Sequence, residues 1–169
     1  MNEDLFYTAF DTAAGWIVLS GSSAGLRRVV LPVKTYDEAV SRLGVDISQE
    51  KEHPAYFQDA VQQLTRYFDG QEVNFNIALD FNGATGFQQK VWQATRLIPY
   101  GKTRSYAWIA GQIDKPQAYR AVGQALGRNP LPVIVPCHRV LSSNGGLGGF
   151  TGGLKMKRFL LNIETKSGG

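Results

Sequence analysis

LFYTAFDTAAGWIVLSGSSAGLRRVVL occupies residues 5–31 of the chain. It contains three runs that are rich in aromatic and β-branched residues, near 5–10, 15–20 and 25–31, and turn-forming residues separate them. Consecutive short strands joined by tight turns are typical of an antiparallel meander. We therefore predict that this part of the chain forms an antiparallel sheet.

Helical patterns follow the predicted strands. A short helix is expected near 36–43, and HPAYFQDAVQQLTRYFDGQ has a longer helical pattern that stops at Gly70. The apolar side chains at helical spacing in this second stretch are Phe57, Val61, Leu64 and Phe68. FNIALDF, at 75–81, is a further strand candidate. Residues 1–82 are therefore predicted to form an α+β domain.

Residues 83–169 are predicted to form a second, mostly helical domain. Thr85 and Ser105 are each placed to cap a short helix, the second of which reads YAWIAGQI. DKPQ is expected to form a turn, and a further helix is expected with Pro116 in its first turn and its end at about Gly127. Two short helices joined by a tight turn are the pattern of a helix-turn-helix, although many helical domains contain such corners.

The second helix of this pattern has one narrow apolar face and one face suited to enter a groove. The residues expected on the exposed face, as candidates for DNA contact, are Tyr119, Arg120, Ala121, Gly123 and Gln124. The small residues among them would let the helix approach DNA closely, or would instead allow close packing against another helix. The helical pattern alone leaves both readings open.

Charge is divided unevenly along the chain. Residues 1–90 carry 7 Lys/Arg and 12 Asp/Glu, a balance of −5, whereas residues 91–169 carry 11 Lys/Arg and 2 Asp/Glu, a balance of +9. A basic half is the electrostatic signature expected of phosphate binding, with a merely basic surface as the alternative. Further cations expected to contact DNA are Lys102, Arg104 and Arg128.

Length and composition limit the other classes. A chain of 169 residues with 43% hydrophobic and 19% charged residues can bury one core or two small ones. One cysteine excludes an intramolecular disulfide, and the acidic start MNED is unlike a signal peptide. No apolar run approaches the ~20 residues that span a bilayer. We therefore expect a soluble cytoplasmic protein that does not bind membranes.

The single cysteine, Cys137, stands beside His138 in VIVPCHRVLSSNGGLGGF. A buried cysteine is most often only a small hydrophobic residue. Several neighbours favour a nucleophile instead: flanking prolines that stiffen the segment, an imidazole that can relay a proton, Arg139, whose charge favours thiolate, and a glycine-rich loop that a ligand can approach. Glu164, in MKRFLLNIE, can orient the imidazole, which completes a carboxylate–His–Cys arrangement.

PCHRV, preceded by RNPLPVIV and followed by GGFTGGLKMKRFLLNIE, resembles the signature of the O6-alkylguanine-DNA alkyltransferases, also called methylated-DNA–protein-cysteine methyltransferases. The resemblance extends back through FQQKVWQATRLIPYGKTRSY and RAVGQALGRNP, and it covers about 85–165. It implies a ribonuclease-H-like N-terminal domain and a winged-helix-like C-terminal domain with a helix-turn-helix. It also implies DNA repair by one direct transfer of the alkyl group from O6-alkylguanine to cysteine, after the damaged nucleotide is flipped out. O4-alkylthymine stays open as a second substrate.

The resemblance assigns catalytic roles by position. Cys137 matches the alkyl acceptor, His138 the base that reaches the thiol through a water, and Glu164 the carboxylate behind the imidazole. Tyr106 matches the tyrosine whose hydroxyl contacts the flipped base. Arg120 matches the arginine that fills the space of the extruded nucleotide in the DNA stack.

The resemblance also implies which residues shape the substrate pocket. Asn129 matches the residue that braces the turn between the recognition helix and the active-site segment. Val140, Phe150 and Thr151 match the pocket wall, where backbone groups read the guanine edge. Phe150 stands where some relatives have tyrosine, so the ring is kept and any contact through a hydroxyl is lost.

No cofactor is implied. Some members of the family carry a structural zinc held by Cys and His in the N-terminal half, but here that half has no cysteine and a single histidine, His53. We therefore predict no metal site of that kind. The implied partner is double-stranded DNA carrying O6-alkylguanine, bound by a monomer, with cooperativity along the DNA left open.

Two other functional classes fit part of the pattern. A Cys-His hydrolase would turn over, and it would not need a helix-turn-helix. A non-catalytic DNA-binding module, either a transcription factor or an alkyltransferase-like damage sensor, would need no acceptor; such sensors lack the acceptor cysteine that this chain has. Alkylated DNA with a labelled alkyl group separates the three classes by where the label ends.

Overall fold

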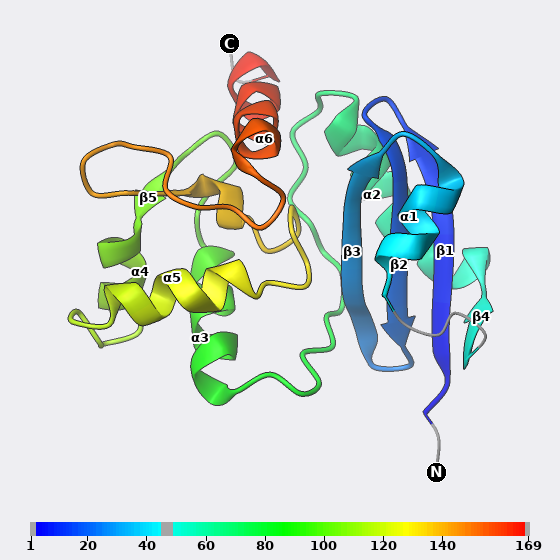
Figure 1. Ribbon diagram of the computed structural model, residues 1–169, viewed down its shortest axis with the longest axis horizontal. Coiled ribbons are helices and arrows are strands. Elements are labelled where there is room, and N and C mark those ends of the chain that lie inside the picture. The colour runs from blue at the N-terminus through cyan, green and yellow to red at the C-terminus, as the bar shows by residue number, and fades with distance from the viewer. Residues whose placement is uncertain (1–2, 45–48, 168–169) are drawn as a thin grey trace. The chain divides into compact units, whose positions relative to one another are not determined.

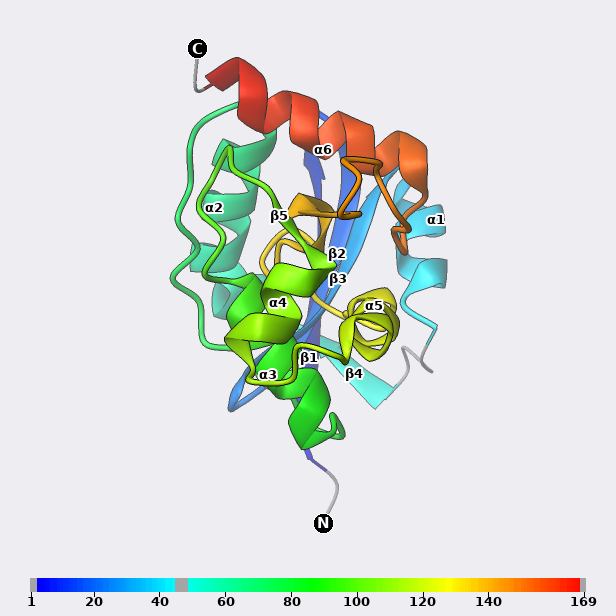
Figure 2. The ribbon, with the colours of Figure 1, turned by 90° about the vertical axis from the view of Figure 1, so that its left-hand side faces the viewer.

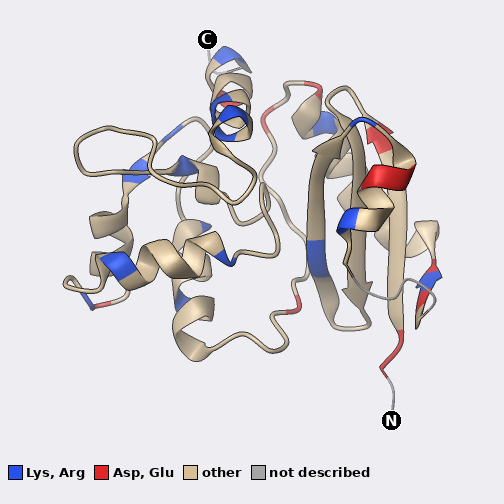
Figure 3. Ribbon diagram, viewed as in Figure 1, with Lys and Arg blue, Asp and Glu red and all other residues tan. Residues whose placement is uncertain are grey.

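The computed structural model describes residues 3–44 and 49–167. The chain folds into two compact units, Met1–Asn82 and Gly83–Gly169, which are described here one at a time. The fold is α+β, as expected from the sequence: the first unit is built on a sheet and the second is mostly helical (Figure 1). Most Asp and Glu residues belong to the first unit, and most Lys and Arg residues belong to the second (Figure 3).

The sheet of the first unit contains the three strands predicted from residues 5–31. They are β1 (Leu5–Thr12), β2 (Gly15–Ser22) and β3 (Gly25–Val33), and both pairings are antiparallel. A fourth short strand, β4 (Glu50–Glu52), pairs parallel to β1, so the strand order is β3-β2-β1-β4. The central strand β2 is covered on both faces, which explains why its interior is a continuous buried run.

Helices on both faces of the sheet provide this cover. The helix α1 (Tyr36–Arg42) and the helix α2 (Gln58–Phe68), which follows the 3₁₀ turn η2 (Pro54–Phe57), lie on opposite faces (Figures 1 and 2). Thr35 caps α1 by accepting from the backbone N–H of Glu38. The apolar cluster under α1 consists of Val18, Val30, Ala39 and Leu43.

The prediction of a strand at FNIALDF is wrong. Only Leu79 in this stretch forms a bridge, to Leu26, whose N–H and C=O bond with Ala78 O and Asp80 N, both at 2.8 Å. Upstream, a side chain replaces a strand partner: Asn76 N–H donates to Gln63 Oε1 of α2 at 3.0 Å. The apolar side chains of the stretch are only half-buried, and most of its backbone hydrogen bonds are not made with a strand.

The second unit begins with α3 (Gly86–Thr95), which Thr85 and Gln88 cap reciprocally in a capping box. The helix-turn-helix consists of α4 (Tyr106–Gln112), capped by Ser105, and α5 (Tyr119–Gly127). Trp92 of α3 donates its indole N–H to the carbonyl of Ala125 at 2.9 Å and so ties α3 to α5. The long helix α6 (Leu154–Ser167) closes the unit, and the view in Figure 2 shows it at one end.

The second helix of the helix-turn-helix starts later than predicted, and Pro116 is not in its first turn. Asp114 adopts a left-handed conformation with φ of 58°, which ends α4. The segment that follows closes a turn of its own, in which Ala118 N–H donates to Lys115 O at 2.9 Å. Pro116 therefore belongs to this turn, and the helix begins at Tyr119. In the part of the chain that the structure describes, no helix is long and apolar enough to cross a membrane.

Candidate active site

Cys137 opens the 3₁₀ turn η3 (Cys137–Arg139) and is only 5% exposed. Asn129, just after α5, holds the segment that leads to it. Its Oδ1 accepts from the N–H of Leu131 at 2.8 Å, and its Nδ2 donates to the carbonyl of Val135 at 2.9 Å and to Sγ of Cys137 at 3.2 Å. Val133, in the same turn, has a left-handed φ of 76°. The amide therefore couples the end of α5 to the thiol.

Glu164 of α6 joins three groups that lie far apart in the sequence. Its Oε2 contacts Nε2 of His138, and both side chains are almost fully buried. The guanidinium of Arg139 donates to the same carboxylate through Nε at 2.7 Å and through Nη2 at 3.2 Å. The backbone N–H of Gly101 donates to Oε1 at 3.1 Å, and Arg139 Nη1 donates to the carbonyl of Ile98 at 2.8 Å. The network pins η3 and the 98–101 loop to α6.

These contacts set the protonation states of the buried pair. Burial alone would raise the pKa of Glu164, but the hydrogen bonds and charges of His138 and Arg139 outweigh it and lower the pKa to about 2. Burial lowers the pKa of His138, although Glu164 opposes that shift. At neutral pH the carboxylate is therefore ionised and the imidazole is neutral, a state in which it can accept a proton.

The thiol itself rests protonated. Burial raises the pKa of Cys137 to about 11, against the opposing effects of the Asn129 hydrogen bond and the positive charge of Lys157. Arg139, which was expected to favour the thiolate, has its charge paired with Glu164. A thiolate has to be generated at the moment of reaction by proton transfer.

Lys157 is a site residue that the sequence interpretation missed. It is fully buried, and its Nζ donates to the carbonyls of Val140 at 2.7 Å and Gly149 at 3.1 Å, and also to that of Leu147. Burial lowers its pKa to about 8, with Cys137 opposing. A signal was present in the sequence, because a lysine and Glu164 both fall on the apolar stripe of α6.

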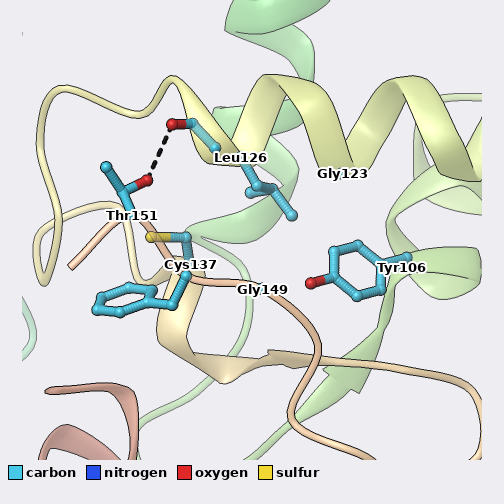
Figure 4. A pocket seen from close by; sticks show the side chains of 8 residues that line it. Tyr106, Gly123, Leu126, Cys137, Gly149 and Thr151 are labelled. Atoms are coloured by element: carbon cyan, nitrogen blue, oxygen red, sulfur yellow. Dashed lines mark hydrogen bonds between the residues drawn. The ribbon is translucent and has the colours of Figure 1, made fainter. Parts of the chain in front are cut away.

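A cavity of about 380 Å³ opens beside the thiol. Figure 4 shows Cys137 at one side, with the hydroxyl of Tyr106 pointing across the pocket toward the loop that carries Gly149. Thr151 donates its hydroxyl to the carbonyl of Gly127 at 2.9 Å, which links that loop to the end of α5 (Figure 4). The lining residues are Tyr106, Gly123, Leu126, Gly127, Cys137, Gly149, Phe150 and Thr151.

Two residues expected at the pocket do not line this cavity. Asn129 and Val140 are buried and absent from the lining of this cavity. Val140 acts through its backbone, since it pairs with Arg104 in the parallel ladder between β5 (Arg104–Ser105) and β6 (Val140–Leu141). This ladder places Tyr106, the first residue of α4, next to the segment that carries the thiol.

Tyr106 fits closely against the glycine-rich loop. Gly148 has a left-handed φ of 67°, and a Cβ there would lie 2.5 Å from the tyrosine hydroxyl oxygen. Burial raises the pKa of Tyr106 and outweighs the opposing effect of the Gly149 backbone. The hydroxyl therefore stays protonated at neutral pH and can donate.

The residues expected to contact DNA lie on and around α5. Arg104 stacks over the ring of Trp108 at 5.5 Å, and Gly123 is partly buried against Tyr106. The other candidates are exposed: Lys102, Tyr119, Arg120, Ala121, Gln124 and Arg128. A second cavity of about 430 Å³ borders this face, and it includes two serines that the sequence interpretation missed, Ser142 and Ser143.

Comparison with known proteins covers both units. Residues 86–166 match the family model described as 6-O-methylguanine DNA methyltransferase, DNA binding domain, and residues 5–81 match its ribonuclease-like domain. A methylated-DNA–protein-cysteine methyltransferase of Mycobacterium tuberculosis is 42% identical over 95% of this chain and 92% of its own length. The constitutive enzyme of that name from Bacillus subtilis is 42% identical over 94% of each chain.

Solved structures agree with these matches. The crystal structure of Mycobacterium tuberculosis OGT in complex with DNA superposes with a TM-score of 0.81 at 40% identity and covers 96% of this chain and 94% of its own. The O6-methylguanine-DNA methyltransferase of Pyrococcus kodakaraensis superposes with a TM-score of 0.70 at 27% identity, over 95% and 98% of the two chains.

Proposed function

Because this chain belongs to the 6-O-methylguanine DNA methyltransferase family, whose members repair DNA by methyl transfer to a protein cysteine, we propose that it acts once per molecule on a flipped-out O6-alkylguanine, with Cys137 as acceptor. The observation that carries the proposal is the position of Cys137, the only cysteine in the sequence, at a pocket that also holds the Tyr106 hydroxyl. Double-stranded DNA carrying the damaged base is the proposed partner.

The transfer exchanges one bond for another. Sγ of Cys137 attacks the alkyl carbon, an S–C bond forms, and the bond from that carbon to O6 of guanine breaks. The electron pair of the broken bond stays on the guanine, where the Tyr106 hydroxyl donates a hydrogen bond as negative charge develops. The thiol proton leaves to His138, and the guanine, which remains part of the DNA, takes up a proton and becomes an unmodified guanine.

The arrangement around His138 supports its role as the base. Nε2 of the ring faces Glu164, so a relay to Cys137 has to use the other ring nitrogen, through a water. When the imidazole takes up the thiol proton it becomes a cation beside an ionised carboxylate, which stabilises the developing charge. This matters because the thiol is protonated at rest.

Access to the pocket requires that the base leave the duplex. A guanine stacked in DNA cannot bring O6 to a thiol that is 5% exposed, so the nucleotide is extruded and Arg120, exposed near the start of α5, fills the gap. One chain is sufficient, because the thiol, the relay, the pocket and the exposed face of α5 all belong to the second unit. The product is a thioether, which has no bond that water readily breaks, so each molecule acts once.

The test is a transfer assay with duplex DNA that carries labelled O6-methylguanine. We expect label on the protein, in equal moles, at Cys137, and none in Cys137→Ser, which should still bind the duplex because a hydroxyl nearly fills the space of the thiol. Label released into solution would identify a hydrolase, and label that stays on DNA would identify a non-catalytic binder. A parallel duplex with O4-methylthymine measures whether that base is a second substrate.

A further inference from the structure

Lys157 lies inside the second unit with all three of its ammonium hydrogens directed at backbone carbonyls. The side chain is fully buried, on the face of α6 that also carries Leu160 and Glu164. Burying a lysine ammonium is costly unless hydrogen bonds replace its water, and three carbonyls replace it here. Nothing in the transfer step described above uses this residue.

The three carbonyls belong to the two ends of one loop. Val140 follows η3 directly, whereas Leu147 and Gly149 flank Gly148. Gly148 leaves no room for a Cβ beside the Tyr106 hydroxyl, and Gly149 lines the cavity beside Cys137. The ammonium therefore closes the loop at its base and determines how far the pocket wall stands from the tyrosine.

Lys157 also differs from the other buried cation near the thiol. The charge of Arg139 is paired with the carboxylate of Glu164, whereas Lys157 donates to neutral carbonyl oxygens. The positive charge of Lys157 favours the thiolate of Cys137 and opposes protonation of His138. Its positive charge is thus available to a thiolate.

We propose that Lys157 is a positioning residue for alkyl transfer: it holds the pocket wall against Tyr106 through three carbonyls, and its ammonium stabilises the Cys137 thiolate through space as that thiolate forms. The proposal rests on the proposed function in one respect, namely that Cys137 is the acceptor. Burial already lowers the pKa of Lys157 to about 8, so the ammonium is present at neutral pH and is lost as pH rises through that value.

The experiment separates the two parts of the role with two reagents of different size. Iodoacetamide is small and reports mainly the reactivity of the thiol, whereas the free base O6-benzylguanine also needs the shape of the pocket. Rates with both are measured across neutral and alkaline pH for the wild type, Lys157→Met and Lys157→Arg. Lys166→Met is the matched control, because Lys166 is an exposed lysine on the same helix.

We expect Lys157→Met to react about tenfold more slowly with iodoacetamide at neutral pH, since one pKa unit corresponds to a tenfold change in thiolate. The difference from the wild type should shrink as pH rises above about 8, where the wild type loses the ammonium. The loss of rate of Lys157→Met with O6-benzylguanine should be larger. Lys157→Arg keeps the charge but cannot direct a planar fork at three converging carbonyls, so it should recover the iodoacetamide rate and not the benzylguanine rate. Lys166→Met should match the wild type.

The proposal is overturned if Lys157→Met folds and keeps the wild-type pH profile of the iodoacetamide reaction. A purely structural lysine would change the stability of the fold without changing that pH profile. Should Lys157→Met fail to fold, Lys157→Arg decides the matter: equal effects of that substitution on both reagents would overturn the proposal. Failure of the proposed function is a separate outcome, since a wild type that takes no label from alkylated DNA would still report the Lys157–Cys137 coupling with iodoacetamide.

Discussion

Nδ2 of Asn129 donates to Sγ of Cys137 at 3.2 Å, and the same nitrogen donates to the carbonyl of Val135 at 2.9 Å. One amide thus orients the thiol and closes the turn that carries it. The contact also lowers the pKa of Cys137, although burial outweighs that effect. Stability of the fold and reactivity of the thiol are therefore coupled at a single side chain.

Asn129→Ala should lower both the stability of the fold and the reactivity of the Cys137 thiol. The substitution leaves the buried N–H of Leu131 and the carbonyl of Val135 without this partner, which should destabilise the fold by about 2 to 4 kcal/mol. The reaction of Cys137 with iodoacetamide should also slow at neutral pH, because the thiolate loses a donor. Urea unfolding and the pH profile of the reaction measure the two effects. A variant with wild-type stability would show that the turn closes without the amide.

Glu164→Gln should destabilise the second unit as well as slow transfer. A glutamine leaves the guanidinium of Arg139 buried without a carboxylate, and breaking a buried ion pair in this way costs about 3 to 5 kcal/mol. Transfer from alkylated duplex should slow because His138 loses the anion that stabilises its protonated form. DNA affinity should stay within a few-fold, provided that it is measured well below the melting temperature. Unchanged stability would contradict the network described here.

In the wild type, protonation of Glu164 at acid pH should lower the free energy of unfolding. The pKa of Glu164 is about 2 in the folded chain against an ordinary value of 4.5, so the unfolded chain binds more protons between these values. The stabilisation is present in full above about 4.5 and is lost as pH falls toward 2. Denaturant unfolding at a series of acid pH values should show a steeper loss for the wild type than for Glu164→Gln. Parallel curves would assign the acid sensitivity to other groups.

Gly148→Ala should damage the pocket through Tyr106. A Cβ at this position would lie 2.5 Å from the tyrosine hydroxyl, so the ring or the loop has to move. The reaction with O6-benzylguanine should therefore slow much more than the reaction with iodoacetamide. Gly145→Ala is the matched control, because Gly145 also has a left-handed φ but a Cβ there meets nothing within 4 Å. Equal effects of the two substitutions would mean that backbone strain, and not the contact with Tyr106, is responsible.

Arg120→Ala should separate anchoring from flipping. If the side chain fills the vacated stack, repair of duplex DNA should fall strongly, because flipping costs a few kcal/mol, while the reaction with free O6-benzylguanine stays unchanged. Arg120→Lys should rescue poorly, since lysine keeps the charge without the planar surface. Rates with duplex DNA, single-stranded DNA and free base are compared. A parallel fall in all three would refute the wedge role, and a loss confined to binding, with a salt slope smaller by about one, would indicate a phosphate contact.

Local patterns predicted most of the elements. The meander at 5–31 and the helix caps Thr85 and Ser105 each depend on residues close together in the chain. Where the predictions failed, a distant or competing partner decided. FNIALDF does not form a strand, because the backbone N–H of Asn76 donates to the side chain of Gln63 in α2. The helix α5 begins late because Asp114 and Lys115 form a turn before it.

The sequence by itself determined the fold class, the helix-turn-helix and the unusual position of a lone cysteine before histidine, because periodicity, caps and spacing are properties of short segments. Only the tertiary structure decided which charges meet. Arg139 next to the thiol looks like an activator in the sequence, yet it pairs with Glu164, while Lys157 is the buried cation whose charge acts on Cys137. The physical reason is that the strength of an ion pair depends on distance and burial, and both are set by how α6 packs on η3 rather than by order along the chain.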